Sequence, residues 1–204
     1  MVRGRPRSFD IDEAIEKAMI VFWAKGYQGT TIPDLAKAIG VNRPSLYAAF
    51  GNKENLFKLA LDRYRKGPAS YVNRALSQTT ALAVFESLLK GVVELVTDRN
   101  RPGGCLFVCG THTLTNPKDD IGRELARRRI EGERDILMRF RHARSEGDLP
   151  DYIDPTTLAK LASSLMWGMA VQASNGATRR HLLELAELAI SSVRSQLRDD
   201  SIDS

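Results

Sequence analysis

The chain contains few of the side chains on which enzyme active sites most often depend. Its 204 residues include three histidines and two cysteines, and these form no recognisable nucleophile–base or acid–base pattern. No apolar run approaches the length of a membrane span, and the basic, polar N-terminus has no signal-peptide core. Two cysteines without a secretory signal suit a reducing compartment, so a cytoplasmic protein is expected. Enzyme function is the weaker hypothesis, and no catalytic residue, cofactor or membrane partner is predicted.

The sequence also has no alternating strand pattern, internal repeat or low-complexity tract. Its hydrophobic fraction of 43% is sufficient for a packed core. Every long periodic segment has helical spacing, which predicts an all-α fold. Beyond residue 69, helices are expected at about 85–96, 121–146, 156–174 and 178–197, with a break at 100–104 and a short apolar segment at 105–114.

Helix start and stop signals are clearest between residues 29 and 57. Thr31 can cap a helix, with Asp34 three residues later as its capping-box partner. Gly40 can end that helix in a left-handed conformation. Asn42 can cap a second helix, with Pro44 in the first turn, where a missing N–H costs little. Two helices joined by such a short turn form the helix-turn-helix that enters the DNA major groove. The other expected boundaries are caps at Asp10 and Asn52 and ends at Gly26 and Lys66.

The positive charge is concentrated at the same end of the chain. Residues 1–66 contain 12 Lys/Arg and 7 Asp/Glu, whereas residues 67–204 contain 18 of each. The excess positive charge therefore accompanies the helix-turn-helix, as expected of a protein that meets phosphate with one end. A chance unevenness of surface charge is the alternative. The Arg-rich segment 123–144 is interleaved with acidic residues, which predicts a solvated, salt-bridged helix face, with an acidic-ligand site as the alternative.

A run of residues between positions 22 and 57 has a recognisable family pattern. Its members are Phe22, Lys25, Gly26, Tyr27, Thr30, Thr31, Ile32, Leu35, Ala36, Gly40, Val41, Ser45, Leu46, Tyr47, Phe50, Lys53, Leu56 and Phe57. Through this run the chain resembles the TetR (tetracycline-repressor) family of bacterial transcriptional regulators. The resemblance covers about the first third of the chain and implies an all-α protein in two parts. The expected division is a flexible basic arm at 1–8, a three-helix DNA-binding domain at 9–66, an effector-binding and dimerisation domain at 67–197, and a polar tail at 198–204.

The resemblance also implies which side chains meet DNA. Tyr47, Thr31 and Lys53 are expected to contact phosphates, while Arg43, Ser45 and Ala48 occupy positions that reach base edges. Arg43 can grip guanine through two hydrogen bonds, and a phosphate contact is the alternative. The small Ala48 limits direct readout. The predicted DNA-binding set is Arg3, Arg5, Thr31, Arg43, Pro44, Ser45, Tyr47, Ala48 and Lys53, with an ordinary disordered terminus as the alternative for the two arginines of the arm.

A second group of interest is Cys105, Cys109 and His112, which share one face if the helix is continuous. Thiolates and imidazole can bind zinc or copper(I), and a cysteine thiolate could report oxidants. The alternative is simple packing, because free cysteine is often buried and apolar residues surround both cysteines. No fourth ligand is evident, so no metal site is assigned.

An effector pocket and a dimer interface are expected in the C-terminal part. The candidate pocket residues are Phe85, Cys105, Phe107, Cys109, Phe140, Met166, Trp167 and Met169, for which core packing is the alternative. The candidate interface residues are Leu158, Leu161, Leu165, Leu182, Ala186, Ala189, Ile190, Val193 and Leu197, on the last two long helices.

These observations predict a homodimeric regulator, more often a repressor than an activator, that binds a near-palindromic operator. A small-molecule effector of unknown class would release it by preferring a conformation with misplaced recognition helices. A metal- or redox-responsive regulator acting through the two cysteines and His112 is one alternative. A non-specific architectural DNA binder is the other.

Overall fold

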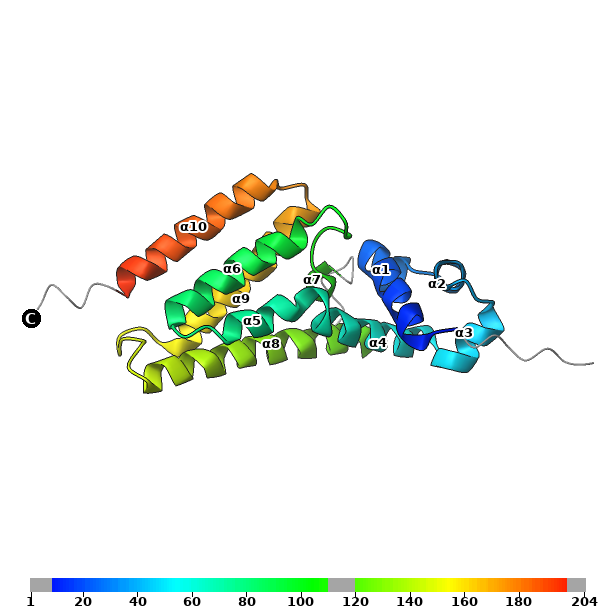
Figure 1. Ribbon diagram of the computed structural model, residues 1–204, viewed down its shortest axis with the longest axis horizontal. Helices are drawn as coiled ribbons and strands as arrows, with labels where there is room; N and C mark the ends of the chain where they lie inside the picture. Colours follow the sequence, from blue (N-terminus) through cyan, green and yellow to red (C-terminus); the bar gives the residue numbers. More distant parts are fainter. Residues whose placement is uncertain (1–8, 110–119, 198–204) are drawn as a thin grey trace, which may run out of the picture.

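The computed structural model describes residues 9–109 and 120–197, and in these ranges it contains helices and no strand. The N-terminal helices are α1 (Ile11–Gly29), α2 (Ile32–Ile39), α3 (Arg43–Phe50) and α4 (Lys53–Lys66). The C-terminal ones are the 3₁₀ turn η1 (Pro68–Ser70), α5 (Tyr71–Leu76), α6 (Ala81–Val96), α7 (Leu106–Cys109), α8 (Asp120–Ser145), α9 (Pro155–Ser174) and α10 (Arg179–Gln196). The predicted all-α fold is confirmed. Helix α3 lies at one end of the molecule, and the end of α10 lies at the other (Figure 1).

The boundaries of the short helices follow the local signals in the sequence. Thr31 and Asp34 form the expected capping box at the start of α2. Gly40 ends that helix with φ 85°, a left-handed conformation that glycine adopts without steric cost. The Asn42 side chain caps α3 by accepting a hydrogen bond from the Ser45 N–H. These caps fix the turn between α2 and α3.

The N-terminal helices are held together by an aromatic core on α1 and α4. The Phe22 and Phe57 rings meet edge to face at 4.9 Å, and Tyr27 packs on Phe57 at 5.1 Å. Phe22 and Phe57 are fully buried, and each large aromatic ring contributes several kcal/mol, typically about 3–5, to stability. Helix α1 is irregular at Gly26, which has φ 68°, so the regular helix breaks where the sequence predicts its end.

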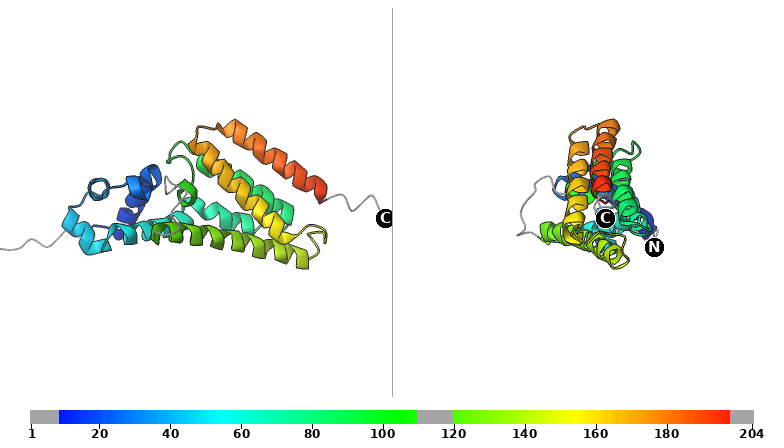
Figure 2. Two further views of the ribbon diagram at one scale, coloured as in Figure 1. Left: turned by 180° about the vertical axis from the view of Figure 1, so that it is seen from behind. Right: turned by 90° about the vertical axis from the view of Figure 1, so that its left-hand side faces the viewer.

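The C-terminal helices form a second core. Helices α6, α9 and α10 lie together on one side of the long helix α8 in both views of Figure 2, and α6 packs against α9 and α10. The buried residues of α6, which begin at Ala81 and include Phe85, belong to this core together with residues of α8, α9 and α10.

The two cores meet at the short helix α7. Helix α7 packs against α1 and α4 on one side and against α8 and α9 on the other. Leu106, Ile121 and Leu125 are buried in the same cluster as the aromatic residues of α1 and α4. The expected boundary at residue 66 therefore separates two groups of helices that share a continuous apolar contact. No helix in the described ranges combines the length and apolar character needed to cross a bilayer.

Candidate nucleic-acid interface and effector cavity

Helix α3 presents one face to solvent and buries the other. Leu46 and Phe50 are buried against the N-terminal core, and this fixes the orientation of the short helix. Arg43, Ala48 and the phenol of Tyr47, which is 46% exposed, lie on the solvent side. Pro44 and Ala49 are also exposed, and Ser45 is half-buried. The predicted DNA contacts of α3 are therefore available on one surface, with Arg43 and Tyr47 as its long polar side chains.

Thr31 lies at the predicted N-cap of α2, where its hydroxyl already has a partner. Its hydroxyl donates to Asp34 Oδ2 at 2.8 Å, and its N–H donates to the same oxygen at 3.0 Å. The Lys25 ammonium bonds the other carboxylate oxygen at 2.8 Å, and Lys25 and then Thr31 hold the pKa of Asp34 well below its usual range. A phosphate contact by the Thr31 hydroxyl would have to replace its bond within the cap.

Lys53 is turned toward the protein instead of projecting freely. Its ammonium donates to the carbonyls of Tyr27 and Thr30 at 2.8 and 2.9 Å, and it lies 4.1 Å from the centre of the Tyr27 ring. Burial lowers the pKa of Lys53. Because an ammonium has three donors, one remains for a phosphate, but the first role of Lys53 is to join α4 to the α1–α2 junction.

Replacing Lys53 with alanine is therefore expected to lower both DNA affinity and stability. The loss of two hydrogen bonds and a cation–π contact should cost about 1–2 kcal/mol of unfolding free energy. Urea unfolding and operator titration of the same sample would measure the two effects. Lys37→Ala, a change at an exposed residue of α2, is the control. Unchanged stability in Lys53→Ala would contradict the joining role.

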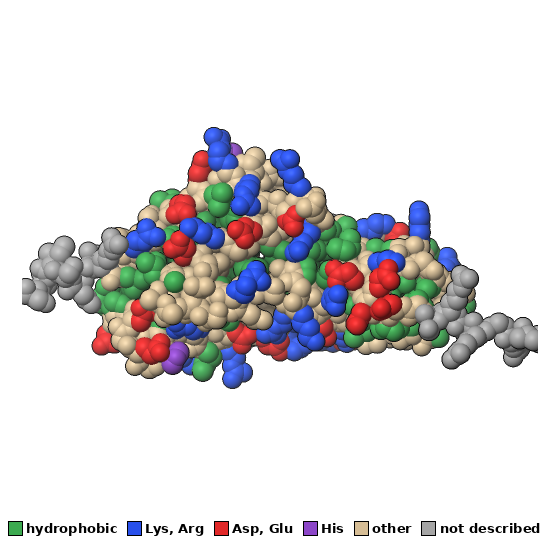
Figure 3. Space-filling model, viewed as in Figure 1, with side chains coloured by type: hydrophobic (Ala, Val, Ile, Leu, Met, Phe, Trp, Pro, Cys, Tyr) green, Lys and Arg blue, Asp and Glu red, His purple; other side chains and the backbone are tan. Residues whose placement is uncertain are grey.

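The charge of the described DNA-binding domain is modest. Residues 9–66 carry a net charge of +2, and the first eight residues add +3. Lys, Arg, Asp and Glu side chains are interspersed over the face shown in Figure 3. Arg3 and Arg5 lie outside the described residues, so their predicted contact with DNA stays a prediction.

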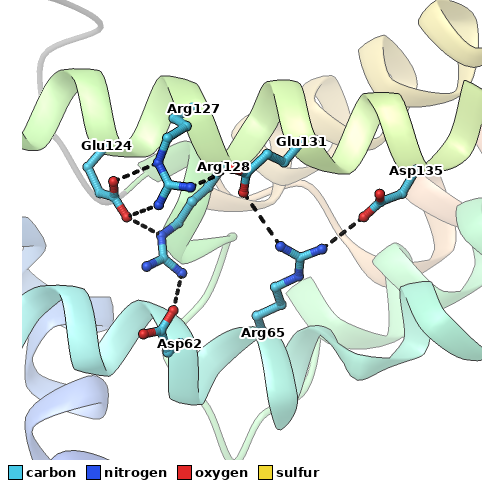
Figure 4. A network of polar contacts seen from close by, with 7 residues as sticks. All are labelled: Asp62, Arg65, Glu124, Arg127, Arg128, Glu131 and Asp135. Atoms are coloured by element: carbon cyan, nitrogen blue, oxygen red, sulfur yellow. Dashed lines mark hydrogen bonds and ion pairs between the residues drawn. The ribbon is translucent and has the colours of Figure 1, made fainter.

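An ion-pair network joins α4 to α8 (Figure 4). The Arg128 guanidinium, 7% exposed, bonds Asp62 of α4 at 2.6 Å and Glu124 of its own helix at 2.7 Å. Arg65 of α4 reaches Asp135 at 2.8 Å and Glu131 at 3.6 Å. The network therefore ties the helix that carries the DNA-binding domain to the longest helix of the C-terminal part. We did not predict these links from the sequence, which offered only the alternating charges of α8 as a signal.

Protonation of Glu124 is expected to lower the stability of the protein in acid. Hydrogen bonds from Arg127, and then from Arg128, hold the pKa of Glu124 to about 2, against an ordinary value of 4.5. A depressed carboxylate pKa adds stability that is complete above the ordinary pKa and is lost as the pH falls toward the folded-state value. Glu124→Gln should reduce the loss of unfolding free energy between about pH 6 and about pH 3 by about 2 kcal/mol. Denaturant titrations at both pH values test this, with Glu94→Gln, at an exposed position of α6, as control. Equal pH dependence in all three proteins would refute it.

A cavity of about 90 Å³ lies between α7, α8 and α9 and the segment that follows α4. Four predicted pocket residues line it, namely Cys105, Phe107, Met166 and Trp167. Phe85, Phe140 and Met169 are fully buried in the C-terminal core and do not line it, so for these three the packing alternative is the one that the structure favours. The polar lining includes Arg65, Tyr71, Arg128, Arg129 and Ser163, residues that sequence reasoning missed because spacing alone does not show which charged positions are covered.

The cysteine group is described only in part. Cys105 is half-buried and lines the cavity. Burial, and to a smaller extent the nearby Cys105, raises the pKa of Tyr64 and of Tyr71. The side chain of Cys109 and all of His112 lie outside the described residues. Within the described ranges no three His, Cys, Asp or Glu side chains are grouped as a metal site would require, and this leaves the three-residue hypothesis untested.

The predicted dimer residues fall on two different faces of α9 and α10. Leu158, Leu182, Ala186, Ile190 and Val193 are buried in the core of one protomer, so they form no surface that a second copy could reach. Leu165, Ala189 and Leu197 are half-buried, and Leu161 is 43% exposed. Val171 of α9 and Leu185 and Leu188 of α10, which are absent from the prediction, are also exposed, at 39%, 38% and 66%.

Comparison with known proteins gives consistent matches. The family model "Bacterial regulatory proteins, tetR family" matches residues 14–60, which span α1 to α4. The HTH-type transcriptional repressor ComR of Escherichia coli (strain K12) is 34% identical, over 90% of this chain and 89% of that protein. The repressor BdcR of the same organism is 26% identical, over 97% of this chain and 96% of that protein.

A solved structure extends the similarity to nearly the whole chain. A cysteine mutant of the TetR family transcriptional regulator CifR, in complex with double-strand operator DNA, matches with a TM-score of 0.86 and 36% identity. The match covers 92% of this chain and 98% of that chain. The similarity therefore includes the C-terminal helices, for which the sequence alone offered no family pattern.

Proposed function

This chain belongs to the TetR family of bacterial DNA-binding transcriptional repressors, and we propose that it binds a near-palindromic operator as a homodimer and leaves it when a small molecule occupies the C-terminal cavity. Its relatives are regulators and not enzymes. The observation that carries the proposal is the solvent-facing side of α3, where Arg43 and Tyr47 project from a helix whose other side is buried.

The geometry of α3 supports recognition in the major groove. Helix α3 is eight residues long and begins with the exposed Arg43 at its N-terminus, the end that meets base edges in helix-turn-helix proteins. Tyr47 lies one turn further along the same face and supports a phosphate contact. Two such helices related by a two-fold axis would read an inverted repeat.

Operator preference separates this proposal from a non-specific architectural binder. A labelled fragment from upstream of its own gene should be bound about 10³-fold or more tightly than random DNA at one fixed salt concentration. Fluorescence anisotropy with random DNA as competitor measures the ratio. Equal displacement by both DNAs would support the architectural binder and contradict the proposal.

The exposed side of α9 and α10 supports dimerisation. Leu161 and Val171 of α9, with Leu185 and Leu188 of α10, are apolar residues that solvent reaches in the single protomer. A second copy packed there in a four-helix arrangement would cover them. The interface we propose is therefore the outer stripe of these helices.

Leu188→Glu should convert the dimer to a monomer, because it places a charge in an apolar contact. Light scattering at micromolar concentration would measure the mass. The matched control is Ile130→Glu on α8, since Ile130 is 67% exposed and Leu188 is 66% exposed. A monomeric parent protein, or a Leu188→Glu dimer as tight as the parent, would contradict the proposed interface.

The cavity supports release by an effector because its walls touch both groups of helices. Arg65 comes from the end of α4, while Phe107 belongs to α7 and Met166 to α9. A molecule that binds better when these walls are spaced differently would shift the position of α4. The difference between its affinities for the DNA-binding and the released conformation would set the loss of operator affinity.

A response through Cys105 is the second candidate, because its thiol lines the same cavity. Operator release by zinc, copper(I) or peroxide in the parent protein but not in Cys105→Ser would favour it. Release by an organic effector and a response through Cys105 both require the protein to meet its operator, so we propose a cytoplasmic location for either function.

A further inference from the structure

The cavity contains a buried hydroxyl without a hydrogen-bond partner. Ser163 of α9 is 2% exposed, and its Oγ has no partner among the residues that the structure describes. A buried hydroxyl that has lost its bond to water and gained no other partner raises the free energy of the folded protein. Because Ser163 lines the cavity, a ligand with an oxygen or nitrogen atom at this wall would remove the cost.

The same cavity contains a cation that no carboxylate neutralises directly. Arg129 is half-buried, and its Nη1 donates to the Phe107 carbonyl at 2.7 Å. Its neighbours Arg127 and Arg128 both pair with Glu124. Across residues 9–109 and 120–197, Arg129 has no carboxylate oxygen within 4.0 Å. Burial lowers the pKa of Arg129.

The other charged groups of the cavity wall have different roles. Arg65 and Asp135 pair with each other, and Arg128 pairs with Asp62. Glu133, one turn beyond Arg129 on α8, also lines the cavity but does not reach the guanidinium. Arg129 is thus the lining guanidinium that remains available to a bound anion.

The remaining wall is apolar and the space is small. Phe107, Met166 and Trp167 are among its apolar side chains. A volume of about 90 Å³ is below the roughly 150 Å³ that holds benzene in an engineered apolar cavity. The cavity is partly open to solvent, so a ligand can place its head group inside while part of a short hydrocarbon body extends through the opening.

We propose that the cavity binds a small organic monoanion, a short-chain carboxylate, whose carboxylate group bonds Arg129 and the Ser163 hydroxyl while its hydrocarbon body packs on Phe107, Met166 and Trp167. This assignment rests on the proposed function, in which an occupant of the cavity releases DNA, and it gives the chemical class of that effector.

The contacts of Arg129 indicate how such an anion would act. Arg129 holds the carbonyl of Phe107, and the Phe107 ring packs edge to face on Tyr64 of α4 at 5.0 Å. Tyr64 in turn packs on Trp23 of α1 at 4.8 Å. The bond to Phe107 uses one of the five guanidinium N–H donors, so a carboxylate can bond the others. We expect the anion to draw Arg129 toward the cavity and to weaken its bond to Phe107, which would loosen α7 from α8 where α7 supports the DNA-binding helices.

Isothermal titration of the full-length protein without DNA tests the ligand class. Hexanoate, 1-hexanol and hexylamine share one chain length and differ in the head group. Hexanoate should bind at least about tenfold more tightly than 1-hexanol, as expected of a charge-assisted hydrogen bond, and hexylamine should bind most weakly. Equal affinity for hexanoate and 1-hexanol, tighter binding of hexylamine, or no binding of hexanoate would overturn the proposal.

Four variants assign the preference to the cavity. Arg129→Met should abolish the preference for hexanoate over 1-hexanol, and Arg129→Lys, which keeps the charge, should retain it even if the methionine variant folds poorly. Arg139→Met is the matched control, because Arg139 is on the same helix and also bonds backbone carbonyls, those of Gln78 and Thr79. Ser163→Ala should weaken hexanoate more than 1-hexanol. A preference that survives in Arg129→Met would overturn the assignment.

The titration separates this inference from the proposed function. If the protein prefers hexanoate but shows no operator preference, the proposed ligand class is supported and the proposed function as a regulator is contradicted. If the protein prefers its operator but binds 1-hexanol and hexanoate with equal affinity, the proposed function is supported and the proposed ligand class is contradicted.

Discussion

Replacing Arg43 with alanine is expected to weaken operator binding of the proposed homodimer by at least about thirtyfold. Each lost Arg–base contact costs about 1–3 kcal/mol, and a dimer on an inverted repeat loses two. Arg43 is exposed at the first position of α3 and has no ion-pair partner in the described part of the chain, so the fold should be unaffected. Operator titration at fixed salt and a thermal melt of the same sample measure both effects.

Arg43→Lys shows which kind of contact is lost. Lysine keeps the positive charge but cannot reproduce the bidentate grip of a guanidinium on guanine. If Arg43 reads a base, the lysine variant should lose most of the operator preference over random DNA. Loss of affinity in equal proportion for operator and random DNA would assign Arg43 to a phosphate instead, and unchanged affinity in both variants would remove it from the interface.

Replacing Trp23 with alanine is expected to lower the unfolding free energy by about 3–5 kcal/mol, the cost of removing a large buried aromatic side chain. Trp23 is 4% exposed and meets the Tyr64 ring edge to face at 4.8 Å. Its indole N–H donates to the Gly104 carbonyl at 3.2 Å. The residue therefore joins α1 to α4 and to the segment before α7, and its loss should loosen both connections.

Trp23→Phe separates packing from the hydrogen bond. Phenylalanine keeps an aromatic ring beside Tyr64 but has no N–H for Gly104, so about 1–2 kcal/mol of the loss should remain. Urea unfolding of the parent and both variants gives the comparison. A loss below about 1 kcal/mol for the alanine variant would mean that α1 is held to α7 by other contacts.

The local boundaries of the DNA-binding helices could be predicted because the signals are themselves local. Thr31, Asn42 and Gly40 each act within a few residues of the chain, so their capping roles need no knowledge of the tertiary structure. The exposed face of α3 follows in the same way from the buried positions of Leu46 and Phe50. Family resemblance added the expectation that this face meets DNA.

The sequence did not determine the contacts of side chains that had two candidate partners. Lys53 begins a helix, a place that suits phosphate, but Tyr27 and Thr30 offer it carbonyls in the folded chain. Leu182 and Leu188 belong to the same apolar helix, and periodicity alone does not show which side faces the protomer's own core. The contacts of Arg129 with α7 depend on residues more than twenty positions away, which no local pattern encodes.

Selection of genomic fragments from the source organism by the purified full-length protein, followed by sequencing, tests the central claim most directly. The account predicts strong enrichment of a few fragments that share an inverted repeat, with half-site centres about one helical turn or a small multiple of it apart. Recovery of fragments with no shared sequence, in proportion to their abundance, would contradict the claim that this chain is a sequence-specific dimeric regulator.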